Sequence, residues 1–441
     1  MKLLIANEVD PMLSWVDWRT YSQRLLWFAK DGDALVLPGI PDAAFLRHVA
    51  GLTGVDPRTV SFHVPPAGRY LGKVVDPYSL LDENFVSGLA KALADKADPV
   101  TEILSCWPSP VLPQLAGRLG LRHLVAGADF IEQGGGDLAN SKATFRALAA
   151  AANVPITPGA VCHTAHDAEQ ALPRLLRGTG VVLVKQSHNG AGAGNQLVVR
   201  DDSHATGHVG AKLLHRLEPG PEAIRDYLAE HWDWASQGGH YPVVIEEFKP
   251  ASRTVYLEFV ADDAGVRHTA TGELDYQERR LVRESTPAHG LSVRLRAGLL
   301  TAAAQLAEQY RAMGYRGYMS ADAIVDGAGG FVFTEMNARV TGSLHIYGPI
   351  AGEVVRADQA PQRTVSQHRT PAGWQPMALE EFLAAAEEAG CGYDPAWRRG
   401  VLVAMPPMPG VRGGFDFCVV HGSSTEEQDI LRALDTRLRA E

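Results

Sequence analysis

Two strand-like segments joined by a glycine-rich turn constrain the fold of this chain more than any other feature. The segments GYMSADAIV and FVFTEMN flank the turn DGAGG, a pattern that predicts a β-hairpin. Alternate side chains of a strand share one face, so we expect Glu335, Asn337 and the following Arg339 to project together. The hairpin therefore predicts a polar patch on one face of a sheet.

The register of this hairpin decides which polar side chains meet. Asp322 lies opposite Glu335 if Val325 pairs with Val332, which leaves a six-residue loop. Two carboxylates and the amide of Asn337 suit Mg²⁺, a hard cation that binds oxygen atoms and shares its other positions with phosphates and water. A solvent-exposed strand face with an ordinary glutamate and asparagine is the alternative.

A second segment, VVLVKQSHNGAGAGN, predicts a strand followed by a hairpin with a glycine-rich tip. Gly190, Gly192 and Gly194 alternate with small residues, so the backbone can approach a ligand closely and turn its N–H groups toward phosphate oxygens. Lys185, at the end of the strand, provides a positive charge for the same phosphates. No G-K-[ST] sequence follows, so the segment is not a Walker A loop. A flexible hairpin tip is the alternative.

Two weaker signals lie on either side of that segment. Lys142 follows Asn140 and Ser141, either of which can cap a helix, and a helix start offers free N–H groups to an anion. The alternative there is a solvated surface lysine. The strand VVIEEFK ends in residues that can present a carboxylate and backbone groups to a purine amino group beside an aromatic ring: Glu246, Glu247 and Phe248. An ordinary core edge is the alternative.

The rest of the sequence predicts an α/β protein. Strand and helix signals alternate over the first 137 residues, which is typical of a mostly parallel sheet. The length of 441 residues predicts two to four domains, and the glycine run 134–136 is the best boundary in the first half. We assign an N-terminal domain and three further segments: 1–137, 138–248, 249–357 and 376–441.

Composition excludes several classes of protein. With 41 Lys and Arg against 51 Asp and Glu, the net charge of −10 argues against a nucleic-acid partner. Four scattered cysteines without a CxxC pair favour a reducing setting over a disulfide framework or zinc site. No segment reaches the ~18 uninterrupted apolar residues of a membrane span. We therefore expect a cytoplasmic protein with neither a nucleic-acid nor a membrane partner.

The order of these motifs resembles the ATP-grasp superfamily over residues of about 138–345. Lys142 is followed by Lys185 with its glycine-rich loop, then by the EEF segment, Asp322 and the E-x-N-x-R segment 335–339. The resemblance implies a Rossmann-like pre-ATP-grasp domain, an ATP-grasp part of α+β character and a small C-terminal extension. Within the superfamily the chain is similar to peptide ligases of the pheganomycin-biosynthesis type, which join a non-proteinogenic amino-acid unit to a peptide.

The resemblance also implies a role for individual residues. Lys142 and Lys185 would contact the α- and β-phosphates of ATP, with Lys185 and Arg339 as the catalytic cations. Asp322, Glu335 and Asn337 would hold one or two Mg²⁺ ions, with Mn²⁺ able to substitute. A mobile loop would cover the phosphates, and its nucleotide-binding members would be His188, Asn189, Gly190, Ala191, Gly192 and Gly194.

For the base and sugar the resemblance is less complete. Glu246 would accept a hydrogen bond from the adenine amino group, with Glu247 beside it and the backbone at Phe248 reading the ring edge. Gln186 stands where many members of the superfamily have proline. No acidic residue follows Phe248 at the distance where many of them bind the ribose hydroxyls, so the ribose ligand is unassigned.

The implied function is that of an ADP-forming carboxylate–amine ligase. Its donor, a small-molecule carboxylate, would be activated as an acyl phosphate and joined to the amine of a peptide in natural-product (antibiotic) biosynthesis, and a homodimer is expected. A kinase-like phosphotransferase and a non-catalytic nucleotide-binding protein stay open as alternatives. Candidate substrate contacts, with surface charges as the alternative, are His268, Tyr276, Arg279, Arg280, His289, Arg294, His345 and Tyr347.

Overall fold

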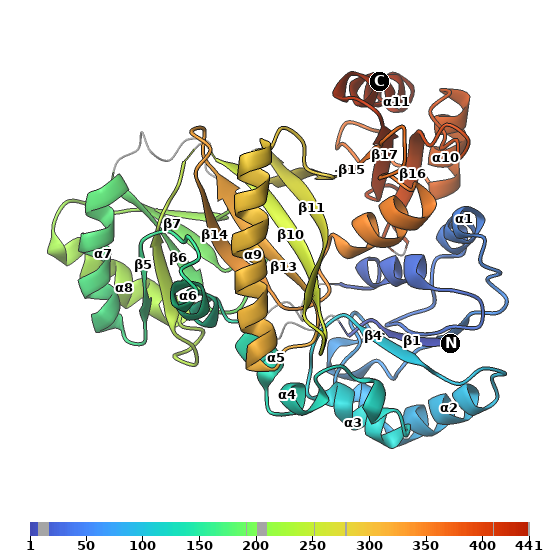
Figure 1. Ribbon diagram of the computed structural model, residues 1–441, viewed down its shortest axis with the longest axis horizontal. Coiled ribbons are helices and arrows are strands. Elements are labelled where there is room, and N and C mark those ends of the chain that lie inside the picture. The colour runs from blue at the N-terminus through green and yellow to red at the C-terminus, as the bar shows by residue number, and fades with distance from the viewer. Residues whose placement is uncertain are drawn as a thin grey trace. The chain divides into compact units, whose positions relative to one another are not determined.

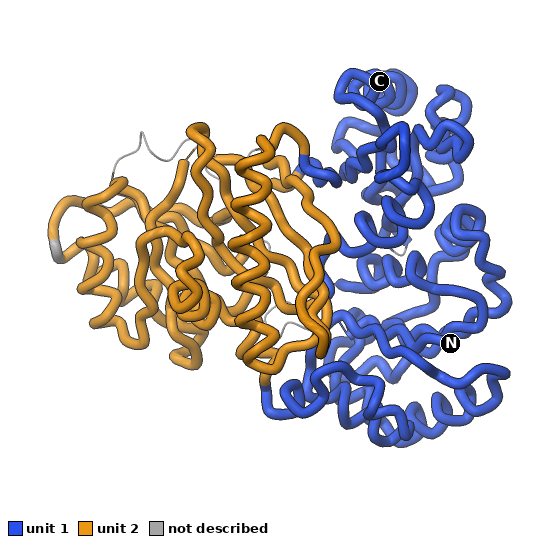
Figure 2. Tube along the Cα trace, viewed as in Figure 1, with its two compact units in different colours: residues 1–134, 282–288, 340–441 blue, residues 135–281, 289–339 orange. Residues whose placement is uncertain are grey.

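The computed structural model (Figure 1) describes residues 1–7, 17–190, 192–200, 210–250, 252–277, 280–408 and 410–439. The chain divides into two compact units (Figure 2). Unit 1 comprises residues 1–134, 282–288 and 340–441, and unit 2 comprises residues 135–281 and 289–339. Every residue predicted to bind nucleotide or metal lies in the numbered ranges of unit 2. The four-part division expected from the sequence is finer and stays a prediction.

The N-terminal part of unit 1 is a four-stranded parallel sheet in the order β3-β2-β1-β4. Asp42 and Asp82 start two of its helices, because each carboxylate accepts a hydrogen bond from a backbone N–H three residues on. Its strands are β1 (Lys2–Ile5), β2 (Ala34–Val36), β3 (Ser61–His63) and β4 (Glu102–Ser105). Its α-helices are α1 (Ala43–Thr53), α2 (Glu83–Ala94), α3 (Val111–Arg118) and α4 (Ala128–Glu132), with short 3₁₀ turns at Tyr21–Phe28, Gly68–Tyr70, Ser79–Leu81 and Arg122–Leu124.

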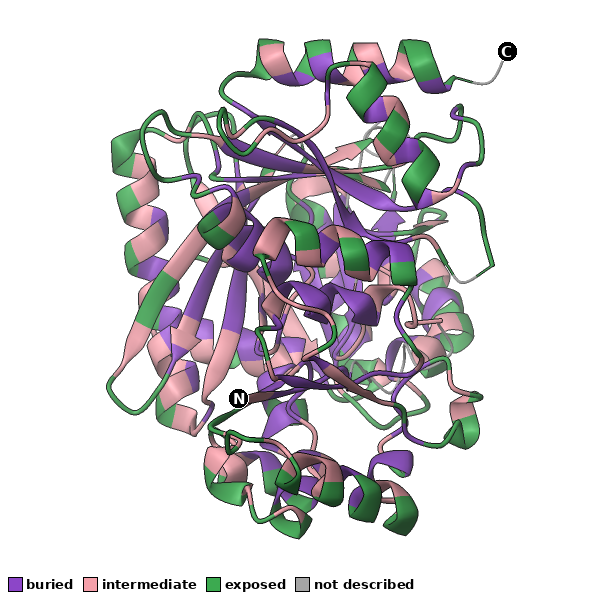
Figure 3. Cartoon of the chain, turned by 90° about the vertical axis from the view of Figure 1, so that its right-hand side faces the viewer, coloured by how far each residue is buried: buried purple, intermediate pink, exposed green. Residues whose placement is uncertain are grey.

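The C-terminal part of unit 1 is an antiparallel ladder in the order β12-β15-β17-β16. Its interior is aromatic, with Phe382 packed on Phe415 and Phe417. The strands are β12 (Arg280–Thr286), β15 (Thr364–Arg369), β16 (Gly400–Met405) and β17 (Asp416–His421); the helices are α10 (Leu379–Glu388), α11 (Ser424–Leu438) and a π-helix at Ile346–Val354. Strand β15 lies in a segment that the sequence analysis left outside the assigned domains. Figure 3 shows the strands mostly buried and the outer helix faces exposed.

Unit 2 contains a five-stranded sheet in the order β5-β9-β6-β7-β8, antiparallel except for the β7–β8 pair. Val182 and Val184 of β6 face a hydrophobic cluster that includes residues of two covering helices. Lys185 lies on the opposite face because strand side chains alternate. The elements are β5 (Gly159–Cys162), β6 (Val181–Gln186), β7 (Asn195–Val199), β8 (Leu213–Arg216), β9 (Val243–Glu247), α7 (Ala165–Thr179) and α8 (Pro221–Ala235).

Four further strands of unit 2 are antiparallel neighbours in the order β14-β13-β10-β11. The long helix α9 packs against β10, β11 and β13 (Figure 1). The elements are β10 (Arg253–Ala261), β11 (Val266–Gln277), β13 (Gly317–Val325), β14 (Phe331–Asn337), α5 (Gly135–Ala139), α6 (Lys142–Ala151) and α9 (Val293–Met313). None of the described helices is long and apolar enough to span a membrane.

The predicted β13–β14 hairpin forms, but the register predicted for its tip is wrong. Val325 pairs with Phe331 and not with Val332. A β-bulge follows Asp322 and inserts one extra residue into β14, which shifts the ladder by one position. Asp322 pairs with Glu335 because of this bulge, and not through the Val325–Val332 pairing on which the sequence analysis made the pair depend.

Candidate active site

The acidic residues of the hairpin form a compact cluster in unit 2. Asp322 and Glu335 are cross-strand partners, and the Nδ2 of Asn337 lies 3.1 Å from Asp322 Oδ2 and 3.3 Å from Glu335 Oε1. The Oγ of Ser320 donates to Asp322 Oδ1 at 3.4 Å. The three residues predicted to hold metal are thus brought together, and a half-turn of the Asn337 amide would present its oxygen to the same point.

Burial and nearby charges shift the pKa values of the two carboxyl groups in opposite directions. Burial and the neighbouring Glu335 raise the pKa of Asp322 well above its usual value. Burial also opposes ionisation of Glu335, but Lys142 and Lys185 outweigh it and lower the pKa of Glu335 to about 2. One carboxyl group therefore favours the protonated form and the other the ionised form, as expected for two neighbouring acids in a partly buried site.

This donor set fits a divalent cation that also binds phosphate. Carboxylate and amide oxygens are the ligands that Mg²⁺ takes in proteins, together with phosphates and water. The described part of the chain contains no group of three His, Cys, Asp or Glu side chains arranged for a metal. A cation held by Asp322, Glu335 and Asn337 would therefore keep positions open for other ligands.

Lys142 joins the acidic cluster to the glycine-rich loop. Ser141 caps helix α6, since its Oγ accepts a hydrogen bond from a backbone N–H in the first turn. The buried Nζ of Lys142 donates to the carbonyl oxygen of Asn189 at 2.7 Å and lies 3.5 Å from Glu335 Oε2. Its backbone N–H donates to the carbonyl oxygen of Ser187 at 3.0 Å. The lysine is therefore no surface residue in this structure.

Lys185 lies on β6 and pairs with Glu246 on the neighbouring strand β9. The other oxygen of Glu246 accepts from Arg146 at 2.9 Å. All three side chains are buried. Sequence reasoning missed Arg146, although its position four residues after Lys142 places both on one side of helix α6.

The glycine-rich loop is held by polar contacts at its start. Gln186 donates to the carbonyl oxygen of Trp234 at 2.7 Å and accepts from Asn189 at 3.1 Å. Asn189 has a φ of 132°, an unusual value for a residue with a side chain. A Cβ on Gly194 would lie 2.6 Å from the Asn189 Cβ, so only glycine fits there. Gln186 thus anchors the loop through side-chain hydrogen bonds that a proline at this position could not make.

Each of three other residues of the predicted loop shows one notable contact or backbone angle. The ring of His188 packs edge-on against Tyr241, with the ring centroids 4.5 Å apart. Gly192 has a φ of 69°, which favours glycine. The N–H of Gly190 donates to the Asn189 side chain at 2.9 Å. Ala191 lies outside the described residues.

Arg339 is held beside the acidic cluster by Asn140. Its Nη1 donates to Asn140 Oδ1 at 2.6 Å. Asn140 in turn donates from Nδ2 to the carbonyl oxygens of Gly136 at 2.9 Å and Ala338 at 3.0 Å. The charge of Arg339 opposes the rise in the pKa of Asp322 and adds to the lowering of the pKa of Glu335. Asn140, considered only as a helix cap from the sequence, therefore orients a predicted catalytic cation.

Glu247, at the end of strand β9, and Phe248, which follows it, lie in different environments. Glu247 reaches the end of helix α7, where a Cβ on Gly178 would lie 2.5 Å from its Oε1. Phe248 is buried in an apolar cluster, and its N–H donates to the carbonyl oxygen of Val181 at 3.2 Å. Phe248 thus forms an apolar wall on the sheet face that carries Lys185 and Glu246.

The candidate substrate contacts are divided between the two units. His268 is half-buried and bonds to Thr271 at 2.9 Å, and burial lowers its pKa. His345 and Tyr347 are buried in unit 1. Arg280, His289 and Arg294 are exposed and Tyr276 is partly buried, whereas Arg279 lies outside the described residues.

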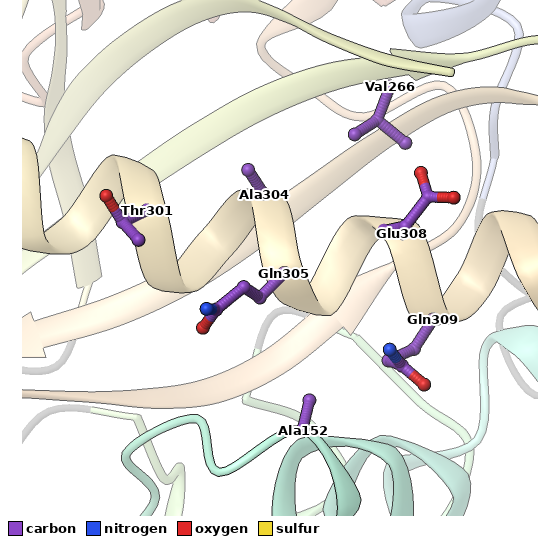
Figure 4. Close-up of a pocket in the computed structure, with 7 residues that line it drawn as sticks. All are labelled: Ala152, Val266, Thr301, Ala304, Gln305, Glu308 and Gln309. Carbon is purple, nitrogen blue, oxygen red and sulfur yellow. The ribbon is translucent and has the colours of Figure 1, made fainter. Parts of the chain in front are cut away.

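Unit 2 also has a surface hollow of about 600 Å³, and none of the candidate substrate contacts lines it (Figure 4). It is formed mainly by one side of helix α9, with Val266 of β11 and Ala152 after α6. The residues that line it are Ala152, Val266, Thr301, Ala304, Gln305, Glu308 and Gln309, none of which was predicted to bind nucleotide or metal.

Comparison with known proteins finds relatives that are similar to this chain in sequence and others that are similar in structure. The family model "Pre ATP-grasp domain" matches residues 22–121. The L-propargylglycine–L-glutamate ligase of Streptantibioticus cattleyicolor is 26% identical over an alignment 375 positions long that covers 78% of this chain and 72% of that protein. Biotin carboxylase of a Nostoc species is 26% identical over 206 residues, 46% of this chain and 41% of that protein.

Solved structures match nearly the whole chain. The L-amino acid ligase from Bacillus licheniformis has a TM-score of 0.53 at 14% identity, covering 99% of this chain and 97% of that one. The N5-carboxyaminoimidazole ribonucleotide synthetase from Thermus thermophilus has a TM-score of 0.58 at 16% identity, covering 100% of this chain and 99% of that one. The similarity of fold therefore extends over both units.

Proposed function

We propose a specific reaction for this chain, which is an ATP-grasp protein of the carboxylate–amine ligase class. The chain would transfer the γ-phosphoryl group of ATP to a carboxylate, and an amine would then displace phosphate from the acyl phosphate. The products would be an amide, ADP and inorganic phosphate. The observation that carries this proposal is the contact of Lys142 with Glu335, 3.5 Å apart, within a partly buried group of cations and acids.

Phosphoryl transfer needs alignment and charge neutralisation more than covalent help from the protein. We assign Lys142 and Lys185 to the α- and β-phosphates. Arg339 would steady the transferred phosphoryl group and later the oxyanion formed when the amine attacks the carbonyl carbon. Its hydrogen bond to Asn140 fixes the direction in which its guanidinium can act.

Asp322, Glu335 and Asn337 are the residues that would hold one or two Mg²⁺ ions, or Mn²⁺ in their place. When bound, the cation supplies charge neutralisation for the phosphates. In this chain the three side chains fix where that charge would lie, since they extend from two paired strands.

The remaining nucleotide contacts are assigned in the same way, from the residues that the sequence predicted. The loop from His188 to Asn195 would cover the phosphates and keep water from the acyl phosphate, which hydrolyses when exposed. Phe248 and the apolar cluster around it would pack beside the adenine ring. Glu246 and Glu247 complete the predicted nucleotide site, and the ribose contact is unassigned.

We infer that the substrates contain amino-acid units. The support is the similarity to a ligase whose name joins L-propargylglycine, a non-proteinogenic amino acid, to L-glutamate, and the shared fold with an L-amino acid ligase. The proposed donor is a non-proteinogenic amino-acid carboxylate and the proposed acceptor a peptide amine, in natural-product biosynthesis. A homodimer and a cytoplasmic location stay predictions.

The test is a substrate screen with the full chain, ATP and Mg²⁺. Carboxylates and amines, with L-propargylglycine, L-glutamate and bicarbonate included, are combined in pairs while ADP and phosphate are measured and products are weighed by mass spectrometry. An amide with one phosphate released per bond supports the proposal. A phosphorylated product without phosphate release indicates a kinase, and nucleotide binding without turnover indicates a binding protein.

A further inference from the structure

A buried row of three charged side chains lies behind the candidate phosphate site. Arg146 of α6 donates from Nη1 to Glu246 Oε2 at 2.9 Å and from Nη2 to the carbonyl oxygen of Thr157 at 2.9 Å. The other oxygen of Glu246, Oε1, pairs with the Nζ of Lys185. The exposed fractions of the three side chains are 8%, 3% and 5% for the arginine, the glutamate and the lysine.

The surrounding backbone leaves room for the arginine. Gly159 of β5 lies beside the guanidinium, where a Cβ would lie 2.6 Å from Arg146 Nη2 and 2.7 Å from the carbonyl oxygen of Ile245. Any larger residue at this position would displace the guanidinium or the neighbouring strand. The arginine thus occupies a place that the sheet keeps open.

The charges of the row do not cancel. Two cations and one carboxylate sum to a net charge of +1, whereas Glu246 with Lys185 alone would be neutral. Because Arg146 engages Oε2, the carboxylate presents Oε1 to the ammonium group and fixes where that group lies. An ammonium group has three N–H donors, so Lys185 keeps donors for a further ligand. A buried net positive charge attracts phosphate more strongly than an exposed one does.

We propose that Arg146 is a positioning residue that acts through Glu246 on Lys185 and keeps the phosphate pocket positively charged. The inference rests on the proposed function, in which Lys185 contacts the phosphates of ATP. It also gives Glu246 a role other than bonding to adenine, because each of its carboxylate oxygens is engaged by a cation.

The experiment is calorimetric titration of the full chain with MgADP and with adenosine, a probe that lacks phosphate. Arg146→Met brings the net charge of the row to zero, and we expect MgADP binding to weaken about tenfold while adenosine binding changes less than about twofold. Arg146→Lys keeps the charge of the row at +1 and a cation beside Glu246, and we expect MgADP binding within about threefold of the wild type. Arg177→Met on the exposed side of α7 is the matched control and changes neither.

The outcomes separate this inference from the proposed function. If Lys185→Met weakens MgADP binding and Arg146→Met does not, the positioning role is refuted alone. If neither variant weakens it, the assignment of Lys185 to the phosphates fails. Loss of MgADP and adenosine binding together in Arg146→Met, without recovery in Arg146→Lys, would show a merely structural arginine.

Arg146→Lys also carries the test if Arg146→Met does not fold, since it keeps a cation beside Glu246. MgADP binding as weak in Arg146→Lys as in Lys185→Met would overturn the inference. Loss of adenosine binding in Glu246→Gln would show that Glu246 contacts the base, which would also overturn it.

Discussion

Replacing Glu335 by glutamine separates stability from activity at the candidate site. The Nζ of Lys142 lies 3.5 Å from Glu335 Oε2, and at an effective dielectric constant of about 20 that attraction is about 5 kcal/mol. The variant loses this attraction, but it also loses the repulsion from Asp322 that raises the pKa of that residue. Because the two changes oppose each other, we expect the free energy of unfolding to change by less than about 2 kcal/mol.

Activity should respond very differently. Glutamine keeps the volume of the side chain but removes the negative charge and one cation-binding oxygen, so we expect turnover to fall at least about 100-fold. The assays are ADP release at saturating ATP and urea denaturation of the same preparations. Glu308→Gln, on the outer side of α9, is the matched control and should retain full turnover. A Glu335→Gln enzyme that keeps more than about a tenth of the wild-type rate would refute the assignment of the acidic cluster.

Three further predictions concern the site, pH and packing. Arg339→Lys should lower turnover about 100-fold with intact folding, because lysine lacks the planar fork that bonds to phosphate or carboxylate; an unchanged rate in the ADP assay would contradict this. Burial lowers the pKa of His48 from 6.5 to about 4, and its Nε2 accepts from the Val403 N–H at 3.0 Å. The unfolded chain therefore binds this proton more readily, so stability is full above pH 6.5 and falls by about 3 kcal/mol as the pH drops to 4, a slope in urea denaturation that His48→Gln should reduce. Gly272→Ala should destabilise the fold by about 1–3 kcal/mol in the same assay, since its Cβ would lie 2.0 Å from the Tyr256 ring; equal stability would contradict the packing described.

The fold could be predicted from the order of motifs along the chain. Lys142, Lys185 with its glycine-rich loop, and the E-x-N-x-R segment are each weak alone, but their order indicated the ATP-grasp fold, and the family match together with the solved structures confirms it. The pre-ATP-grasp domain is confirmed over residues 22–121. Order along the chain carries this information because it constrains which strands must follow one another.

The hairpin shows where pattern reasoning stops. From the sequence, Asp322 would meet Glu335 only if Val325 paired with Val332. The structure has the first pair without the second. The bulge that makes this possible could not be read from the sequence, because no residue type in β14 marks where an extra residue enters the ladder.

Contacts between distant parts of the chain were also missed. Arg146 and Glu246 are 100 residues apart, and Asn140 and Arg339 are 199 apart. No local spacing encodes such pairs, since they depend on how strands and helices pack. The individual roles of the nucleotide and metal residues stay predictions for the same reason.

The most direct test of the proposed reaction follows the oxygen atoms of the donor. If the carboxylate attacks the γ-phosphate and the amine then displaces phosphate, one carboxylate oxygen must leave with that phosphate. A donor labelled with ¹⁸O in its carboxylate should therefore deliver one labelled atom to inorganic phosphate for each amide formed, as measured by mass spectrometry. Label in AMP, or labelled oxygen retained in a phosphorylated product, would contradict the acyl-phosphate mechanism.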